Sequence, residues 1–206
     1  NAPAAMAPWG GNRAVFGTDP VAFACPLPGR APIVVDLSLS KVARGHILTA
    51  IQKGESIPEG WALDVNGKPT TDARAALAGT MIPLGDAKGT ALALMVELLT
   101  SVLLDNDILS QYLDPQGDHH LRQNALFITI KVDAYRALSS YTAAVGLLEQ
   151  ILKQQPLAAG ADAIRLPGER GARLRSQRLQ QGIPLPAAVW KQLAALATQV
   201  GVALPE

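Results

Sequence analysis

Short apolar runs separated by turn-forming residues mark the first part of the chain. The runs Val21–Cys25 and Ile33–Leu37 are bounded by proline, glycine and aspartate, so each is predicted to be a strand. Pro28-Gly29 lies between them, and a proline–glycine pair is typical of a turn. The pattern therefore predicts a hairpin-type pair of strands.

Two segments further along have the features of capped helices. Residues 41–52 carry apolar positions at helical spacing and follow Ser38, a residue type that often caps a helix start. Residues 72–78 are rich in alanine and follow Thr71, which with Asp72 is predicted to cap a short helix. Both segments end before a glycine, as helices commonly do.

The middle of the chain contains its most apolar stretch. Residues 89–104 are apolar on nearly every side, so they are predicted to form a central helix that is buried all round. The polar, acidic stretch 105–123 is predicted to be a loop or lid. Leu126 to Val132 alternates as a strand does. Helical patterns then cover 134–154, 169–180 and 186–200. An α/β lobe followed by helices is the expected fold.

Composition narrows the class of protein. The chain has 206 residues and is 49% hydrophobic, which allows a sizeable core and argues against disorder. The net charge of +1 gives no sign of a nucleic-acid partner. The apolar stretch is shorter than the ~20 residues that span a bilayer, so no membrane association is expected.

Cysteine and histidine usage suggests neither a disulfide nor a metal site. Cys25 is the single cysteine, which excludes an intramolecular disulfide and fits a reducing, cytoplasmic setting. It is predicted to fill space in the core. His119-His120 has no third ligand at a metal-like spacing, so no metal is expected.

The junction between the second strand and the following helix is one candidate site. Asp36, Leu37 and Ser38 would offer a carboxylate, backbone N–H groups and a hydroxyl to a nucleotide. Ordinary capping of the helix by Ser38 is the commoner role for such a serine. Arg44 and His46 follow at the helix start, where His46 could relay protons or simply lie in solvent.

Two glycine-containing segments are further candidates. Residues 85–89 place Lys88 between glycines, which would let the backbone approach a phosphate while the lysine supplies a cation. A turn with a solvated lysine is the alternative. Residues 167–170 open a basic helix that could hold phosphate, although a solvated charged face is commoner. No glycine-rich dinucleotide fingerprint and no phosphate-binding P-loop occurs in the sequence.

Several blocks keep a fixed order along the chain: GTDPVAFA (17–24), DLSLSKVARG (36–45), IPEGWALD (57–64), GKPTTD (67–72), ALAG (76–79), PLG with KG and LALMVELL (83–99), and PGER (167–170). Together they resemble the malate/L-lactate dehydrogenase-like family of NAD(P)H-dependent oxidoreductases. The block at 36–45 is most similar to the Δ1-piperideine-2-carboxylate/Δ1-pyrroline-2-carboxylate reductases of that family.

The resemblance implies a fold and an activity. The fold would be α/β, with a non-Rossmann NAD(P)H-binding domain of largely antiparallel mixed sheet, followed by C-terminal helices. Residues 1–133 would form the major part of that domain. Residues 134–206 would be a helical segment that packs with an N-terminal helical domain absent from this sequence. The activity would be NADPH-dependent reduction of a cyclic imino acid to a cyclic L-amino acid, with NADH as a possible cofactor. A malate/lactate-type 2-hydroxyacid dehydrogenase, or a non-catalytic fragment that binds nucleotide or a partner chain, are the alternatives.

The resemblance also assigns roles by position. Thr18 would lie by the substrate, which is a small carboxylate, and His46 would occupy a proton-relay position where some imine-reducing relatives carry aspartate. The residues expected to contact the cofactor are Asp36, Leu37, Ser38, Arg44, Ala87, Lys88, Gly168 and Glu169. Members of the family are typically homodimers. Their catalytic histidine, its serine neighbour and a carboxylate-binding arginine lie on the N-terminal segment, so this chain alone is expected not to catalyse.

Overall fold

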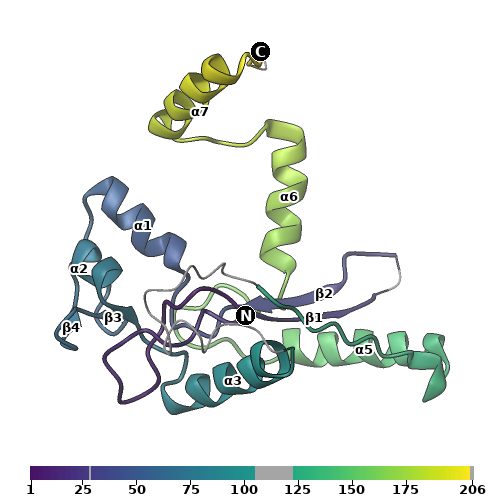
Figure 1. Cartoon of the computed structure of the whole chain (residues 1–206). Helices are drawn as coiled ribbons and strands as arrows, with labels where there is room; N and C mark the ends of the chain where they lie inside the picture. Colours follow the sequence, from purple (N-terminus) through teal and green to yellow (C-terminus); the bar gives the residue numbers. More distant parts are fainter. Residues whose placement is uncertain (28, 105–122, 205–206) are drawn as a thin grey trace.

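The computed structural model describes residues 1–27, 29–104 and 123–204 (Figure 1). The strands are β1 (Val21–Cys25), β2 (Ile33–Leu37), β3 (Ala62–Leu63), β4 (Pro69–Thr70) and β5 (Thr80–Met81). The helices are α1 (Arg44–Lys53), α2 (Ala73–Ala78), α3 (Ala87–Glu97), α5 (Leu138–Lys153), α6 (Glu169–Gln181) and α7 (Ala187–Val200). A π-helical turn, η1 (Leu98–Val102), continues α3, and a 3₁₀ turn, η2 (Val132–Ala134), precedes α5. The protein is therefore a mixed α/β structure, as the sequence predicts.

The predicted hairpin is confirmed. β1 and β2 pair antiparallel, with Val21 opposite Leu37 and Cys25 opposite Ile33. Their bounds are the two apolar runs of the sequence, because β-branched residues favour the extended backbone and the proline and glycine residues end it. Cys25 is buried, as predicted, with its Sγ 3.1 Å from the Tyr141 hydroxyl oxygen.

A second small sheet holds the core of the molecule. It has the order β4-β3-β5, and all its ladders are antiparallel. The segment before Phe16 joins it, since Met6 bridges to both Phe16 and Met81. The core packs α1, α2 and α3 against this sheet; its buried members are Met6, Leu39, Val42, Ile47, Ala50, Ile57, Ala62, Ala73, Ala76, Met81 and Ala93.

The two predicted caps differ from those observed. α1 begins at Arg44 rather than near residue 41, and no side chain caps it. The Ser38 hydroxyl instead lies 2.9 Å from that of Ser40, so its predicted capping role is wrong. α2 is capped by Asp72, not Thr71: the Asp72 carboxylate accepts from two backbone N–H groups of the first turn. A shift of one residue in where the helix starts decides which side chain reaches these N–H groups.

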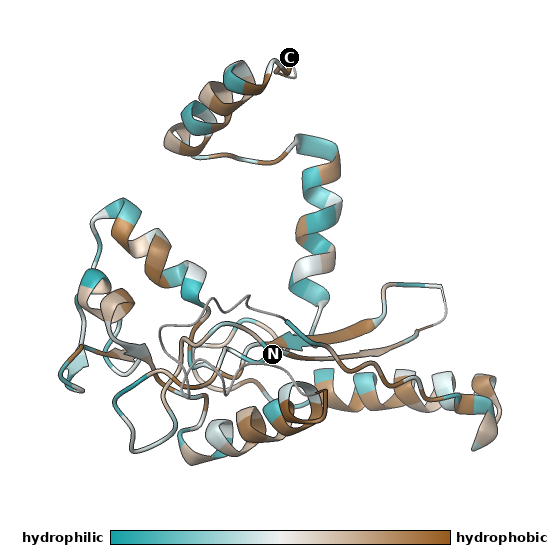
Figure 2. Cartoon of the chain, in the orientation of Figure 1, coloured by the Kyte–Doolittle hydropathy of each residue, from teal (hydrophilic) through white to brown (hydrophobic). Residues whose placement is uncertain are grey.

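The apolar stretch at 89–104 forms the predicted helix, as α3 and η1, but the prediction that it is buried all round is wrong. Ala93 is fully buried against the core, whereas Leu94, Leu98 and Val102 are about half exposed. In Figure 2, the brown colour along much of α3 marks its hydrophobic residues. Hydrophobicity marks a residue as suited to burial, but a neighbour must be present to cover it.

The C-terminal part is helical, as predicted, but it is little buried. α5, α6 and α7 match the three predicted helices, and Figure 1 shows α6 and α7 extending away from the rest. The strand predicted at 126–132 is wrong, since no strand is assigned in residues 123–204. An alternating pattern needs a neighbouring strand before it becomes a ladder.

Within the described residues, no helix is long and apolar enough to cross a membrane. Neither does that part of the chain gather three or more His, Cys, Asp or Glu side chains in a way that could hold a metal ion. The predicted loop or lid, with His119-His120, lies largely outside the described residues.

Candidate functional site

The candidate site is centred on the connection between β2 and α1, residues 38–43, which we call the hub. The Leu39 N–H donates to the Thr18 carbonyl at 2.8 Å, and the Leu84 N–H donates to the Leu39 carbonyl at 2.7 Å. Ser40 forms a bridge with Pro83. Leu39 is fully buried, so the hub is anchored in the core. Segments around residues 18, 39 and 84, far apart in sequence, are thereby brought together.

Lys88 lies next to this hub, in the first turn of α3. Its N–H donates to the Gly85 carbonyl at 3.1 Å, and its side chain is exposed, as is Ala87. Asp86, which precedes the helix, has a φ of +61°, a strained value for a non-glycine residue. A Cβ at Gly89 would lie 2.2 Å from the Leu84 carbonyl oxygen, so only glycine lets α3 start this close to the hub.

Arg44 and His46 occupy the first turns of α1, which follows the hub in the sequence, and both are exposed. The His46 ring lies edge-on to Trp61, with 6.3 Å between the ring centroids. A histidine in this setting can donate, accept or exchange a proton with a bound molecule. Its place near the hub is compatible with the predicted relay role, which stays a prediction.

Val34, Asp36 and the 167–168 turn lie along the edge of β2 that faces away from β1. The Val34 N–H donates to the Pro167 carbonyl at 3.2 Å, which seats the 167–168 turn on that edge. Backbone groups of a strand alternate between its two edges, so the N–H of Asp36 points to the same side as that of Val34. Asp36 and Leu37 are exposed and Ser38 is half-buried. The residues of β2 and of the 167–168 turn that are predicted to contact the cofactor therefore lie in the same part of the structure.

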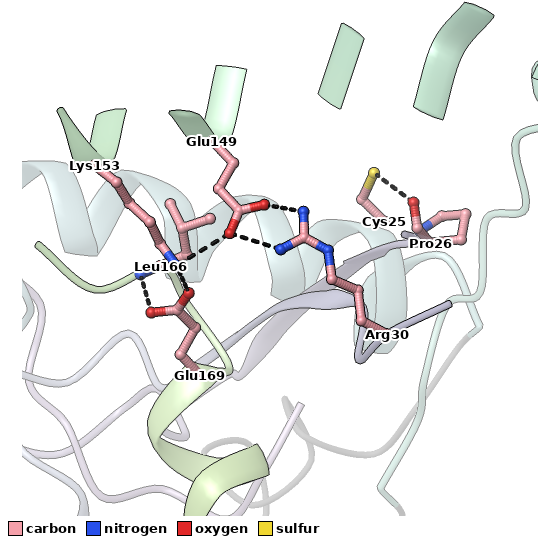
Figure 3. A network of polar contacts seen from close by, with 7 residues as sticks. All are labelled: Cys25, Pro26, Arg30, Glu149, Lys153, Leu166 and Glu169. Atoms are coloured by element: carbon pink, nitrogen blue, oxygen red, sulfur yellow. Dashed lines mark hydrogen bonds and ion pairs between the residues drawn. The ribbon is translucent and has the colours of Figure 1, made fainter. Parts of the chain in front are cut away.

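Glu169 has a more constrained position than the sequence suggests. Its carboxylate pairs with Lys153 of α5 and accepts the Leu166 N–H at 3.1 Å (Figure 3). The hydrogen bond from Lys153 is the main cause that holds the pKa of Glu169 below its ordinary value. No local sequence signal marks Lys153 as its partner, because the two residues come from different helices.

A buried acidic pair was missed by the sequence analysis. Asp19 is fully buried and Glu97 is 6% exposed; both Asp19 carboxylate oxygens and Glu97 Oε1 lack a hydrogen-bond partner among the described residues. Loss of hydration, followed by the nearby charge of Glu97, raises the pKa of Asp19 to about 7. Asp19 also has a φ of +36°. The one available signal was its place in the GTDP block at 17–20.

A cavity of about 1290 Å³ lies elsewhere among the described residues. It is walled by β1, α3 with η1, the segment 123–136 and Tyr141 of α5. None of the predicted site residues lines it. We therefore place the candidate site at the hub and the β2 edge, where polar groups converge, and not in this largely apolar cavity.

These groups suit an elongated anionic ligand. Lys88 and Arg44 supply cations in the first turns of α3 and α1, and these helix starts add backbone N–H donors. The edge of β2 adds further backbone donors, and the 167–168 turn lies against it. Such an arrangement can bind phosphate groups at one point and a planar or ribose group along the strand edge.

Comparisons with known proteins agree on the family. The model for "Malate/L-lactate dehydrogenase" matches residues 1–194. The chain is 46% identical over 96% of its length to (2R)-3-sulfolactate dehydrogenase (NADP(+)) of Chromohalobacter salexigens, covering 57% of that protein. It is 37% identical over 93% of its length to the Δ1-pyrroline-2-carboxylate/Δ1-piperideine-2-carboxylate reductase of Pseudomonas aeruginosa, covering 56% of it.

Solved structures give the same answer. A dehydrogenase from Sinorhizobium meliloti superposes with a TM-score of 0.76 at 34% identity, over 95% of this chain and 57% of that one. The Δ1-piperideine-2-carboxylate reductase from Pseudomonas syringae gives 0.65 at 29%, over 94% and 57%. The chain thus spans about half the length of the curated relatives it matches. From its sequence and its fold alike, this chain belongs to the malate/L-lactate dehydrogenase family.

Proposed function

We propose that the chain is the major cofactor-binding part of an enzyme that uses NADPH to reduce a cyclic imino acid, Δ1-piperideine-2-carboxylate or Δ1-pyrroline-2-carboxylate, to the cyclic L-amino acid. The observation that carries the cofactor site is the hydrogen-bonded hub, which brings Thr18, Leu39 and Leu84 together beside Lys88. Several relatives at 36–39% identity are named as reductases of these imines. Residues 1–133 would be the cofactor domain, with a non-Rossmann sheet.

The cofactor fits the residues at hand. Lys88 and Ala87 would hold phosphate oxygens at the start of α3, and Asp36, Leu37 and Ser38 would line the nucleotide along the β2 edge. Arg44 would meet the 2′-phosphate that distinguishes NADPH from NADH. Gly168 would lie over the cofactor, because its turn is already seated on β2. The bound cofactor would supply the hydride, and these residues would orient it.

Thr18 and His46 would act on the substrate. Thr18 is half-buried, and its carbonyl accepts the Leu39 N–H. This hydrogen bond fixes the Thr18 backbone and would hold the Thr18 side chain in position for a small carboxylate substrate. His46 would supply or relay a proton. An imine is protonated more readily than a ketone, so a modest acid such as histidine is sufficient.

A 2-hydroxyacid dehydrogenase of the malate or lactate type is the second candidate. The specific observation in its favour is the 46% identity to a sulfolactate dehydrogenase. Because the 206-residue chain alone is expected not to turn over, the two activities would be separated on the form that includes the N-terminal segment implied by the resemblance, by comparing its rate of NADPH oxidation with Δ1-piperideine-2-carboxylate and with 2-oxo acids. If that form binds NADPH but reduces neither compound, the result would support the third alternative, a non-catalytic chain that binds nucleotide.

The cofactor site is tested by titrating NADPH into the chain and following its fluorescence. Lys88→Ala should weaken binding by about 1.5–3 kcal/mol, the usual worth of a hydrogen bond to a charged group. Folding should be unchanged, since Lys88 is exposed. Lys191→Ala, an equally exposed lysine in α7, is the matched control and should bind as the parent does. Equal dissociation constants for all three proteins would remove Lys88 from the site.

Turnover is tested separately from binding. We expect the 206-residue chain to bind NADPH and not to oxidise it, because it spans only about half the length of the curated relatives it matches. The active form would be a cytoplasmic homodimer that includes the N-terminal helical segment implied by the resemblance. Steady NADPH oxidation by the 206-residue chain with an imino acid would contradict this expectation.

A further inference from the structure

Four charged side chains from three segments meet beneath the start of α6 (Figure 3). Arg30, from the β1–β2 turn, donates to both carboxylate oxygens of Glu149 on α5, with Nη1 3.0 Å from Oε1. Lys153, one helical turn further on, has its Nζ 3.0 Å from Glu149 Oε1 and also pairs with Glu169 of α6. We call these four residues the ion cluster. Its charges sum to zero.

The ion cluster is organised around a buried carboxylate. The Glu149 side chain is 7% exposed, and its pKa is lowered first by the hydrogen bonds from Arg30 and then by those from Lys153. A buried carboxylate that lost one of these partners would be left charged and poorly solvated. The cluster therefore favours one arrangement of the hairpin turn, α5 and the start of α6.

That arrangement fixes the turn at 166–169. Glu169 uses one carboxylate oxygen for Lys153 and the other for the Leu166 N–H. Between these two residues, the Pro167 carbonyl accepts the Val34 N–H, and Gly168 adopts a φ of +91°. A Cβ at Gly168 would lie 3.0 Å from the Val34 nitrogen. The turn is thus held on the edge of β2 at one end by Val34 and at the other by the ion cluster.

We propose that Glu169 is a positioning residue that does not touch the cofactor: together with Lys153, Glu149 and Arg30 it holds the Gly168 turn on the edge of β2. This inference rests on the proposed function, because it gives the turn its purpose as one wall of the NADPH site. Asp36 lies two residues beyond Val34 on the same edge, about 6.6 Å along the strand. The ion cluster thereby sets the gap between Gly168 and the Asp36–Ser38 segment.

Amide hydrogen exchange and NADPH titration, measured on the same variants, test the inference. Lys153→Met and Glu169→Gln should both speed exchange at the Val34 amide and weaken NADPH binding about tenfold, since the turn would then have to be ordered when the cofactor binds. Lys153→Arg keeps the charge and should restore both readouts. Lys191→Met in α7 is the control and should change neither.

The outcomes separate this inference from the function on which it rests. If Glu169→Gln weakens NADPH binding while Lys153→Met does not, Glu169 contacts the cofactor directly and the inference is wrong. Unchanged Val34 exchange in both variants also overturns it. If the parent chain binds no NADPH, the proposed function fails for this chain, and the cofactor part of the inference fails with it. Val34 exchange would still decide whether the ion cluster holds the turn.

Discussion

Residues 1–104 and residues 123–204 differ in how their apolar side chains are covered. The clustered hydrophobic core draws all its members from the first region. In the second region only Glu149 and Leu166 are buried, although α5 and α7 are rich in leucine and alanine. The short helix α2 buries Ala73 and Ala76, whereas the longer α7 buries no residue. Burial thus follows the presence of neighbours rather than the hydrophobicity of a helix.

Leu39→Ala should have the largest effect on stability, because Leu39 is fully buried and joins the hub to the core. Removing a buried leucine side chain costs about 2–5 kcal/mol through lost transfer energy and the cavity left behind. The midpoint of urea denaturation, followed by circular dichroism, measures this loss. A loss below about 0.5 kcal/mol would mean that the first region is not packed as described.

Asp19→Asn should come next, and its effect should depend on pH. The folded pKa of Asp19 is about 7 and the ordinary value is 3.8. Between about pH 4 and 7 the unfolded chain releases this proton and the folded chain keeps it, so the free energy of unfolding falls as pH rises. The full shift corresponds to roughly 4 kcal/mol, lost by about pH 7.

Asparagine cannot ionise, so the variant should lack this slope and be more stable than the parent above pH 7. Urea titrations at pH 5, 6, 7 and 8 would show it, with Asp36→Asn, at an exposed position, as the control. If the stability of the parent protein does not change over this pH range, the pKa of Asp19 is not raised in the way described.

Arg44→Ala tests an exposed residue of the first region, residues 1–104. Arg44 is exposed at the start of α1, so its loss should leave stability unchanged. Binding of NADPH should weaken by about 1.5–3 kcal/mol, while binding of NADH, which lacks the 2′-phosphate, should change little. Parallel titrations of both cofactors provide the measurement. An equal loss for both would place Arg44 elsewhere in the site.

Leu196→Ala should have the smallest effect and is the direct counterpart of Leu39→Ala. Leu196 is 54% exposed on α7, so its truncation should change stability by less than about 0.5 kcal/mol. The same urea experiment applies. A loss as large as that of Leu39→Ala would show that α7 is covered in solution, by another copy or another segment, and the contrast between the two regions would no longer hold.

Features that depend on short stretches of sequence were predictable. β1 and β2 match the two predicted runs, and α5, α6 and α7 fall within a few residues of the predicted helices. Apolar periodicity, turn residues and helix stops act over a few residues, so one segment contains all the information needed. The ordered blocks are likewise short stretches of sequence, and they indicated the family. The match to the family model confirms that family.

Other features required the tertiary structure, because they depend on which distant residues become neighbours. The apolar pattern at 89–104 does not reveal what covers it, and the alternation at 126–132 has no partner strand in the described chain. Arg30 and Glu149 are 119 residues apart and still form an ion pair, in which the carboxylate is buried and the arginine is half exposed. Periodicity determines which face of a segment is apolar, but desolvation and charge pairing are settled only when another segment packs against that face.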